Sequence, residues 1–278
     1  MEASTLLSEH QQLRPWCNRV EQAFSRAARS YDGAAQVQRE TAKELATRIL
    51  REPHDHLEKI LDVGTGTGEL ALLLAALLPG SRIAGCDISK AMIEGAMRKA
   101  RGRSLANIGF HSGPAERLPY PSETFSLTAS SLALHWADDP QHWIKEQARV
   151  LRPRGRLQFA TSAPDTLPEL RASLQTVLGE DCRTCGFPPP EHLAELLESE
   201  GFSDVSLETR TFVEHHHSAR SLFASMRARG VRLPPPDHRP LSISQIRNLL
   251  AFYDAHFVQA GGVRASYRVI FGKGVLRG

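Results

Sequence analysis

The feature that most constrains how this chain can fold is a glycine-rich turn between a strand and a helix. Residues 59–70 read Lys-Ile-Leu-Asp-Val-Gly-Thr-Gly-Thr-Gly-Glu-Leu, and an alanine- and leucine-rich helix follows. A second apolar strand, 82–86, ends in Asp87. Glycines let the backbone bend tightly and approach a ligand, and a helix N-terminus exposes free N–H groups. A carboxylate at the end of the second strand accepts hydrogen bonds from the two hydroxyls of a ribose. The segment predicts a nucleoside-binding α/β unit.

The acid before the first glycine, Asp62, indicates which nucleoside binds. A dinucleotide pyrophosphate would be repelled by it, whereas S-adenosylmethionine carries a sulfonium, an α-amino group and a ribose but no phosphate. The segment resembles the first motif of class I S-adenosylmethionine-dependent methyltransferases. The alternative is a strand–turn–helix corner without a ligand. The residues expected to contact the cofactor here are Asp62, Gly64, Thr65, Gly66, Gly68 and Asp87.

Composition excludes several other classes of function. The 278 residues carry a net charge of only +3, with no lysine/arginine block, so a general nucleic-acid binder is not expected. The longest apolar run, 70–78, is too short to span a bilayer, and no signal peptide is recognisable. Cys182 and Cys185 have metal-ligand spacing but lack a second pair, and His215–His217 reads as a polar turn. We expect a cytoplasmic enzyme without a metal and without a membrane partner.

Strands and helices alternate along most of the chain, which predicts a Rossmann-like, doubly wound and mostly parallel sheet of seven strands. Helices are expected at 20–50, before the first strand, and a helical cap at about 214–260 is inserted before the last strand. Residues 1–18 are predicted to be a disordered N-terminus and 19–278 a single methyltransferase domain. The expected strands are 59–63, 82–87, 107–111, 125–130, 156–161, 204–213 and 267–271.

Parallel sheets bind ligands at the carboxyl ends of their strands. Ala115 and Glu116 follow the third strand, and Ser130 and Leu132 follow or end the fourth, so we expect them at the cofactor. Ile88 and Met92 are expected to pack against the adenine.

One position departs from the class. Many methyltransferases read Gly-Asp-Ala-Glu-Arg-Leu-Pro after the third strand, and that Asp binds the adenine amine. Here Pro114 stands in its place and brings neither an acceptor side chain nor an N–H. The Ala115 N–H, the Glu116 carboxylate or the shape of the pocket alone remain as ways to hold the adenine.

Several stretches along the whole chain resemble one family. They include 23–31 (Ala-Phe-Ser-Arg-Ala-Ala-Arg-Ser-Tyr), 131–136 (Ser-Leu-Ala-Leu-His-Trp), 167–170 (Leu-Pro-Glu-Leu), 221–227 (Ser-Leu-Phe-Ala-Ser-Met-Arg), 241–246 (Leu-Ser-Ile-Ser-Gln-Ile) and 265–272 (Ala-Ser-Tyr-Arg-Val-Ile-Phe-Gly). Together, in this order, they resemble the malonyl-[acyl-carrier protein] O-methyltransferases of biotin synthesis. The resemblance implies methyl transfer to the free carboxylate of a malonyl thioester on acyl carrier protein. It also implies that Tyr31 closes over the cofactor, joined by Gln38.

The implied chemistry needs no general base, because a malonyl carboxylate is already ionised at pH 7. We therefore expect no catalytic triad, and assign Tyr31, His135 and Trp136 to positioning. A carboxylate in a dry pocket requires a cationic partner, for which Arg227 and Arg229 are the candidates. Arg26 and Arg29 are candidates for facing the acidic helices of a carrier protein.

Two alternatives remain at this stage. One is an O-methyltransferase of another small carboxylic acid, which would accept free malonate or its coenzyme A ester as well as the carrier-bound form. The other is a non-methylating assembly factor that binds S-adenosylmethionine, which would bind the cofactor without turnover.

Overall fold

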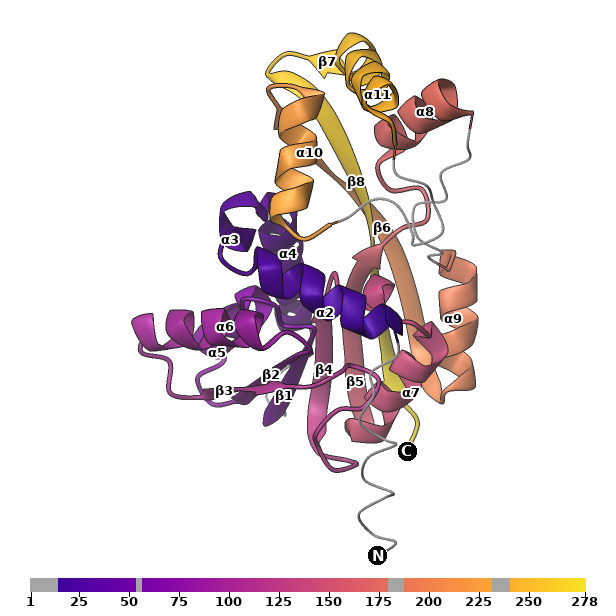
Figure 1. The fold of residues 1–278 in the computed structure, drawn as a ribbon. Coiled ribbons are helices and arrows are strands. Elements are labelled where there is room, and N and C mark those ends of the chain that lie inside the picture. The colour runs from indigo at the N-terminus through magenta and orange to yellow at the C-terminus, as the bar shows by residue number, and fades with distance from the viewer. Residues whose placement is uncertain (1–14, 54–56, 180–187, 232–240) are drawn as a thin grey trace, which may run out of the picture.

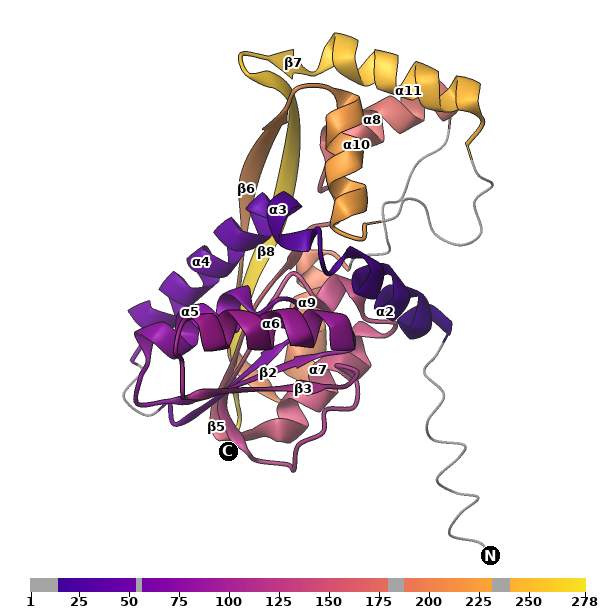
Figure 2. The same ribbon diagram turned by 60° about the vertical axis from the view of Figure 1, so that its left-hand side comes forward.

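The computed structural model describes residues 15–53, 57–179, 188–231 and 241–278, arranged around one central sheet (Figures 1 and 2). The strand order is β3-β2-β1-β4-β5-β8-β6. Strands β1 to β5 run parallel, and β8 pairs antiparallel with both β5 and β6. The strands are β1 (Lys59–Val63), β2 (Arg82–Asp87), β3 (Ile108–Ser112), β4 (Phe125–Ser131), β5 (Leu151–Ser162), β6 (Phe202–His216), β7 (Val258–Gln259) and β8 (Gly262–Leu276).

Helices cover both faces of the sheet, as the alternating sequence predicts. The helices are α2 (Pro15–Ala27), α3 (Tyr31–Ala34), α4 (Gln36–Arg51), α5 (Glu69–Leu77), α6 (Lys90–Gly102), α7 (Pro140–Val150), α8 (Pro168–Leu178), α9 (Pro190–Ser199), α10 (Ala219–Ala228) and α11 (Ile243–His256). One apolar core joins α4 and α5 to the sheet, and a second joins α7 and α9 to its other face. The Rossmann-like α/β fold is confirmed.

The strand count differs from the prediction of seven. The eighth strand is β7, two residues long, which pairs with β8 through Val258↔Val263 and Gln259↔Gly262. Such a short strand carries no period that a sequence pattern could reveal.

Strands β6 and β8 are longer than predicted, fifteen residues each. Only Arg156–Ser162 of β5 pair with β8, so the ends of β6 and β8 continue past the sheet as a two-stranded arm, seen in Figure 1 as the long ribbon that rises to the cap. The sequence does not predict this extension of β6, because the polar run His215–His217 interrupts the alternation of apolar residues that indicates a strand.

The cap at the end of this arm contains an unexpected member. Helices α10 and α11 lie between β6 and β8, as predicted, but α8, which follows β5, packs with them. Leu170 and Leu174 of α8 join Leu222 of α10 and Tyr253 of α11 in a core of their own.

The N-terminal boundary also differs. Residues 15–18 were expected to be disordered but belong to α2, with Pro15 at a helical start position that proline favours. Cys17 and Val20 are buried, and the Trp16 indole N–H donates to the Trp136 carbonyl at 2.9 Å. These contacts supply the packing that holds the helix. Residues 1–14 lie outside the described part of the chain.

Candidate active site

A cavity opens at the carboxyl ends of the parallel strands, between the sheet, α2, α3 and the cap. The volume of this cavity is about 190 Å³. The predicted residues that line it are Tyr31, Gln38, Gly64, Gly66, Asp87, Ile88, Met92, Ala115, Glu116, Leu132, His135, Trp136 and Arg229. The predicted residues that do not are Asp62, Thr65, Gly68, Ser130 and Arg227.

The glycine turn shapes one wall. Gly64, Gly66 and Gly68 all have positive φ, at +70°, +54° and +87°. A Cβ on Gly64 would lie 2.1 Å from the Ala133 Cβ, whereas a Cβ on Gly66 would meet no protein atom within 4 Å. Gly64 therefore serves close packing within the protein, and Gly66 leaves open space on the cavity side for a ligand.

Asp62 lies behind this turn and holds it in place. Its carboxylate accepts from the Thr65 hydroxyl at 2.7 Å and from the Ala71 N–H at 3.2 Å, and it is 1% exposed. Burial raises the pKa of Asp62 to about 7, against the lowering effect of these two hydrogen bonds. The two contacts tie Asp62 to the turn and to the start of α5, and its Oδ1 is buried without a hydrogen-bond partner in the described residues. Ser130 is similarly internal, and its hydroxyl donates to the Val63 carbonyl at 2.8 Å.

Asp87 stands on the cavity at the end of β2. One carboxylate oxygen accepts from the Gly66 N–H and the other from the Ser89 N–H, both at 2.8 Å. Burial raises the pKa of Asp87 to about 6, although the two N–H groups favour the ionised form. Each oxygen keeps acceptor capacity, so the ionised carboxylate is fixed in place to receive the two hydroxyls of a ribose. Ile88 and Met92 line the cavity beside it.

The N-terminal helices supply the opposite wall. Tyr31 packs edge-on against Phe24, and the Phe24 ring packs edge-on against Trp136. Burial raises the pKa of the Tyr31 phenol above its usual range, the negative charge of Asp87 raises it further, and the positive charge of Arg229 lowers it. Tyr31 therefore lines the cavity within electrostatic reach of both Asp87 and Arg229.

His135 belongs to the short 3-10 helix Leu134–Trp136 that follows β4. Burial lowers the pKa of His135 to about 3, so the ring is neutral at pH 7. Its Nδ1 lies 3.5 Å from the Thr161 hydroxyl. A neutral ring with a lowered pKa is a poor general base at pH 7.

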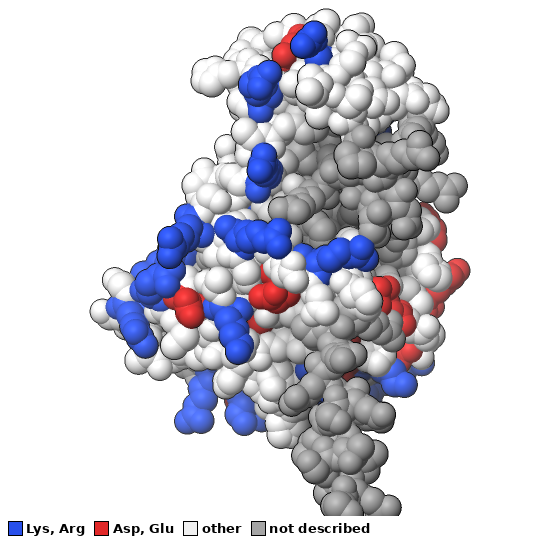
Figure 3. Space-filling model, viewed as in Figure 1, with Lys and Arg blue, Asp and Glu red and all other residues white. Residues whose placement is uncertain are grey.

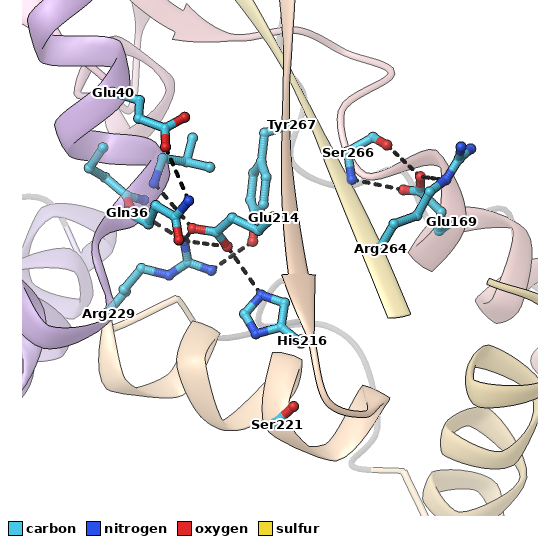
Figure 4. Close-up of polar contacts among 12 residues, drawn as sticks. Gln36, Glu40, Glu169, Glu214, His216, Ser221, Arg229, Arg264, Ser266 and Tyr267 are labelled. Atoms are coloured by element: carbon cyan, nitrogen blue, oxygen red, sulfur yellow. Dashed lines mark hydrogen bonds and ion pairs between the residues drawn. The ribbon is translucent and has the colours of Figure 1, made fainter. Parts of the chain in front are cut away.

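Arg229, the residue that follows α10, lines the cavity and belongs to a buried polar cluster (Figure 4). It is 1% exposed. Its Nη2 donates to the Tyr267 hydroxyl at 2.6 Å, and its Nη1 lies 3.4 Å from both carboxylate oxygens of Glu214 and from the Gln38 side-chain oxygen. The Nε atom is buried without a hydrogen-bond partner in the described residues. A buried, unpaired donor on a cavity wall is a place for an anionic group.

Arg227 is exposed on α10 and does not reach the cavity. The structure thus separates the two arginine candidates.

Several residues of the site are not predicted from the sequence, among them the lining residues Thr166, Leu167 and Tyr267, and Glu214, which contacts Arg229. A glutamate flanked by Val213 and His215 in a strand gives no sign of burial by itself. Only the register Phe212↔Tyr267 and Glu214↔Ala265 brings β6 and β8 together here. Tyr267 does lie in the 265–272 stretch that carries the family resemblance, which was a signal for its importance.

Within the described residues, no group of three or more His, Cys, Asp or Glu side chains is arranged to hold a metal ion. Cys182 and Cys185 lie outside those residues. No helix in the described part of the chain is both long and apolar enough to cross a membrane.

Comparisons with known proteins bear on the fold and the family of the chain. Residues 61–159 match the family model of a methyltransferase domain. A crystal structure of the YcgJ protein from Bacillus subtilis superposes with a TM-score of 0.62 at 19% identity, covering 84% of this chain and 98% of that one, which supports the fold.

Two curated relatives cover most of the chain. A malonyl-[acyl-carrier protein] O-methyltransferase from Halorhodospira halophila is 31% identical over 91% of this chain and 85% of its own length. The protein of the same name from Methylococcus capsulatus is 33% identical over 76% of this chain and 75% of its own length. The chain therefore belongs to the malonyl-[acyl-carrier protein] O-methyltransferase family.

Proposed function

We propose that the protein transfers a methyl group from S-adenosylmethionine to the free carboxylate of a malonyl thioester carried by acyl carrier protein, in the cytoplasm, as the priming step of biotin synthesis. The observation that carries the proposal is that one cavity is lined both by Asp87 and by the buried, partly unpaired Arg229. The first group suits a ribose and the second suits a carboxylate.

We assign the cofactor to the Asp87 end. The fixed carboxylate receives the ribose hydroxyls, the open side of Gly66 leaves room for the backbone to approach the ligand, and Ile88 and Met92 offer apolar surface to the adenine. Glu116 lines the cavity near this end, and one of its oxygens accepts from the Asp138 N–H at 3.3 Å. Its other oxygen is our candidate acceptor for the adenine amine, in place of the acid that Pro114 replaces.

The substrate end requires no proton transfer. Bound S-adenosylmethionine supplies an electrophilic methyl group on a positively charged sulfur. A malonyl carboxylate oxygen forms the new carbon–oxygen bond as the carbon–sulfur bond breaks, and that electron pair stays on sulfur. A negative and a positive charge are both neutralised. The residues of this chain have to align the reacting groups and exclude water. Arg229 orients the carboxylate, while Tyr31, His135 and Trp136 shape the space between the two ligands.

The surface around the cavity supports an acidic protein as the carrier of the substrate. Figure 3 shows lysine and arginine side chains over the face that carries α2 and α10. The exposed arginines there are Arg19, Arg26 and Arg29 in and just after α2, and Arg220 and Arg227 on α10. Both helices also line the cavity, through Phe24 and Met226 among others. Arg227 thus becomes a candidate for contact with the carrier, not with the carboxylate.

The test is a methylation assay with malonyl-loaded acyl carrier protein and labelled S-adenosylmethionine. Mass spectrometry should find one added methyl group as an ester on the carrier. Acetyl-loaded carrier should gain none, and Asp87→Ala should lose the activity. Cofactor binding without methylation would refute the proposal and favour an assembly role. Equal activity on free malonate or malonyl coenzyme A would point to another small-acid O-methyltransferase.

A further inference from the structure

The buried ion pair at the substrate end has two members of opposite charge, and only Arg229 is explained so far. Glu214 of β6 is 3% exposed. One carboxylate oxygen accepts from the Val37 N–H at 3.1 Å, and the other lies 3.2 Å from His216 Nε2. Contacts from the start of α4 and from β6 itself therefore hold Glu214 beside Arg229.

We propose, on the basis of the function proposed above, that Glu214 is a positioning residue that limits the hold of Arg229 on the substrate. As a built-in counter-ion, it keeps the substrate carboxylate bound weakly and from one side, so that one oxygen stays free to react and the neutral ester can leave.

The donors of Arg229 support a one-sided contact. An arginine with both sides open binds a carboxylate as a fork, through two nitrogens and two oxygens. Here Glu214 and Gln38 lie at Nη1, and the Tyr267 hydroxyl takes one of the two N–H groups of Nη2, so a ligand can approach only along the edge formed by Nε and the second Nη2 N–H. Nε is the nitrogen left without a partner (Figure 4). A carboxylate held mainly through Nε keeps its second oxygen available as the nucleophile.

The charge balance supports the same role. The Arg229–Glu214 pair is neutral as a unit, so the carboxylate enters a site without an excess positive charge. Charge disappears from that carboxylate in the transition state, so an uncompensated arginine would stabilise the ground state more than the transition state and slow the reaction. After the reaction, the ester no longer balances Arg229. Glu214 then spares the enzyme a buried, uncompensated charge.

The decisive variant is Glu214→Gln, which keeps the size and an acceptor oxygen but removes the charge. With malonyl-loaded carrier protein, we expect the KM to fall about tenfold and kcat to fall about tenfold, because Arg229 now faces the substrate without a competing anion. Inhibition by free malonate should become stronger for the same reason.

Glu169→Gln is the matched control. Glu169 is also buried, 1% exposed, and is also paired with an arginine, at 2.8 Å from Arg264 Nε. It accepts from the N–H and the hydroxyl of Ser266, which ties α8 to β8 inside the cap (Figure 4), and it does not line the cavity. This variant should lose stability without any fall in KM.

The proposal is overturned if Glu214→Gln raises the KM or leaves it unchanged while activity falls, since that is the behaviour of a structural residue. If Glu214→Gln does not fold, Glu214→Asp is the second test. Its shorter side chain moves the carboxylate away from Arg229, so KM and kcat should fall together, by a smaller factor than in Glu214→Gln. A raised KM would overturn the proposal. A wild-type protein that does not methylate malonyl-loaded carrier would refute the proposed function itself, which separates the two failures.

Discussion

At the scale of single residues, we expect Asp87 to make the binding of S-adenosylmethionine depend on pH. Its pKa is raised to about 6 in the free protein, and ribose hydroxyls donate to the ionised form. Binding therefore lowers this pKa, and affinity is full above pH 6 and falls as the pH drops through it. We expect the dissociation constant of S-adenosylmethionine to rise about tenfold per pH unit below that point. Calorimetric titrations between pH 5 and 8 would measure it, with circular dichroism to verify folding. Asp87→Asn should bind weakly with no such slope.

Two glycines of the same turn should respond to alanine in opposite ways. In Gly66→Ala the new methyl group meets no protein atom, so we expect a folded protein, destabilised by about 1 kcal/mol by its positive φ, that binds cofactor poorly. In Gly64→Ala the methyl group collides with Ala133, so the loss of stability should be clearly larger. Thermal denaturation and cofactor titration of both variants would test this. Normal cofactor affinity in Gly66→Ala would contradict the assignment of its open side to the ligand.

At the scale of elements, a small cluster of polar and charged side chains joins α3 to the glycine-rich turn and to α6. Asp32, next to Tyr31 in α3, accepts from the Thr67 hydroxyl at 2.6 Å and pairs with Lys99 of α6 at 3.2 Å. The cluster anchors α3, the helix that carries Tyr31 on the cavity wall. Because the Asp32 side chain is 51% exposed, the contribution is small.

We therefore expect Asp32→Asn to raise the KM for S-adenosylmethionine about threefold at low salt and less at high salt, with kcat nearly unchanged. Steady-state kinetics at two ionic strengths would measure both constants. Glu58→Gln is a suitable control, because it removes an exposed ion pair, with Arg152, just before β1 and away from the carboxyl ends of the strands. A similar change in both variants would count against the role of the cluster.

At the scale of the whole molecule, cofactor binding should protect only part of the chain. Residues of α2, α3 and α10 line the cavity, whereas none from α9 or α11 do. A ligand at one hundred times its dissociation constant stabilises the folded state by about 2.7 kcal/mol. Hydrogen exchange below the level of global unfolding should therefore slow in α2, α3 and α10 but not in α9 or α11. Equal slowing in α11 would mean that the cap closes as one body.

The sequence predicts the parts of the molecule that depend on local signals, but not those that depend on contacts between distant segments. Asp87 and the glycine turn depend on local signals, and the bounds predicted for β1 and β2 agree with the structure. Their placement on one cavity follows from the rules of parallel sheets. The Arg229 cluster is different, since Arg229, Glu214, Gln38 and Tyr267 meet only through the long pairing of β6 with β8 and the packing of α4. Contacts between distant segments leave no local pattern to read.

The composition of the cap limits how this protein can be redesigned or can exchange parts with relatives. Its core draws Leu167, Leu170 and Leu174 from α8 and the residue before it, ahead of β6, and its other buried members from α10, α11 and the start of β8. A chimera that grafts only the segment between β6 and β8 onto another methyltransferase would therefore expose the apolar surface that α8 covers in this protein. We therefore expect that transferring this cap to another methyltransferase requires both α8 and the segment between β6 and β8.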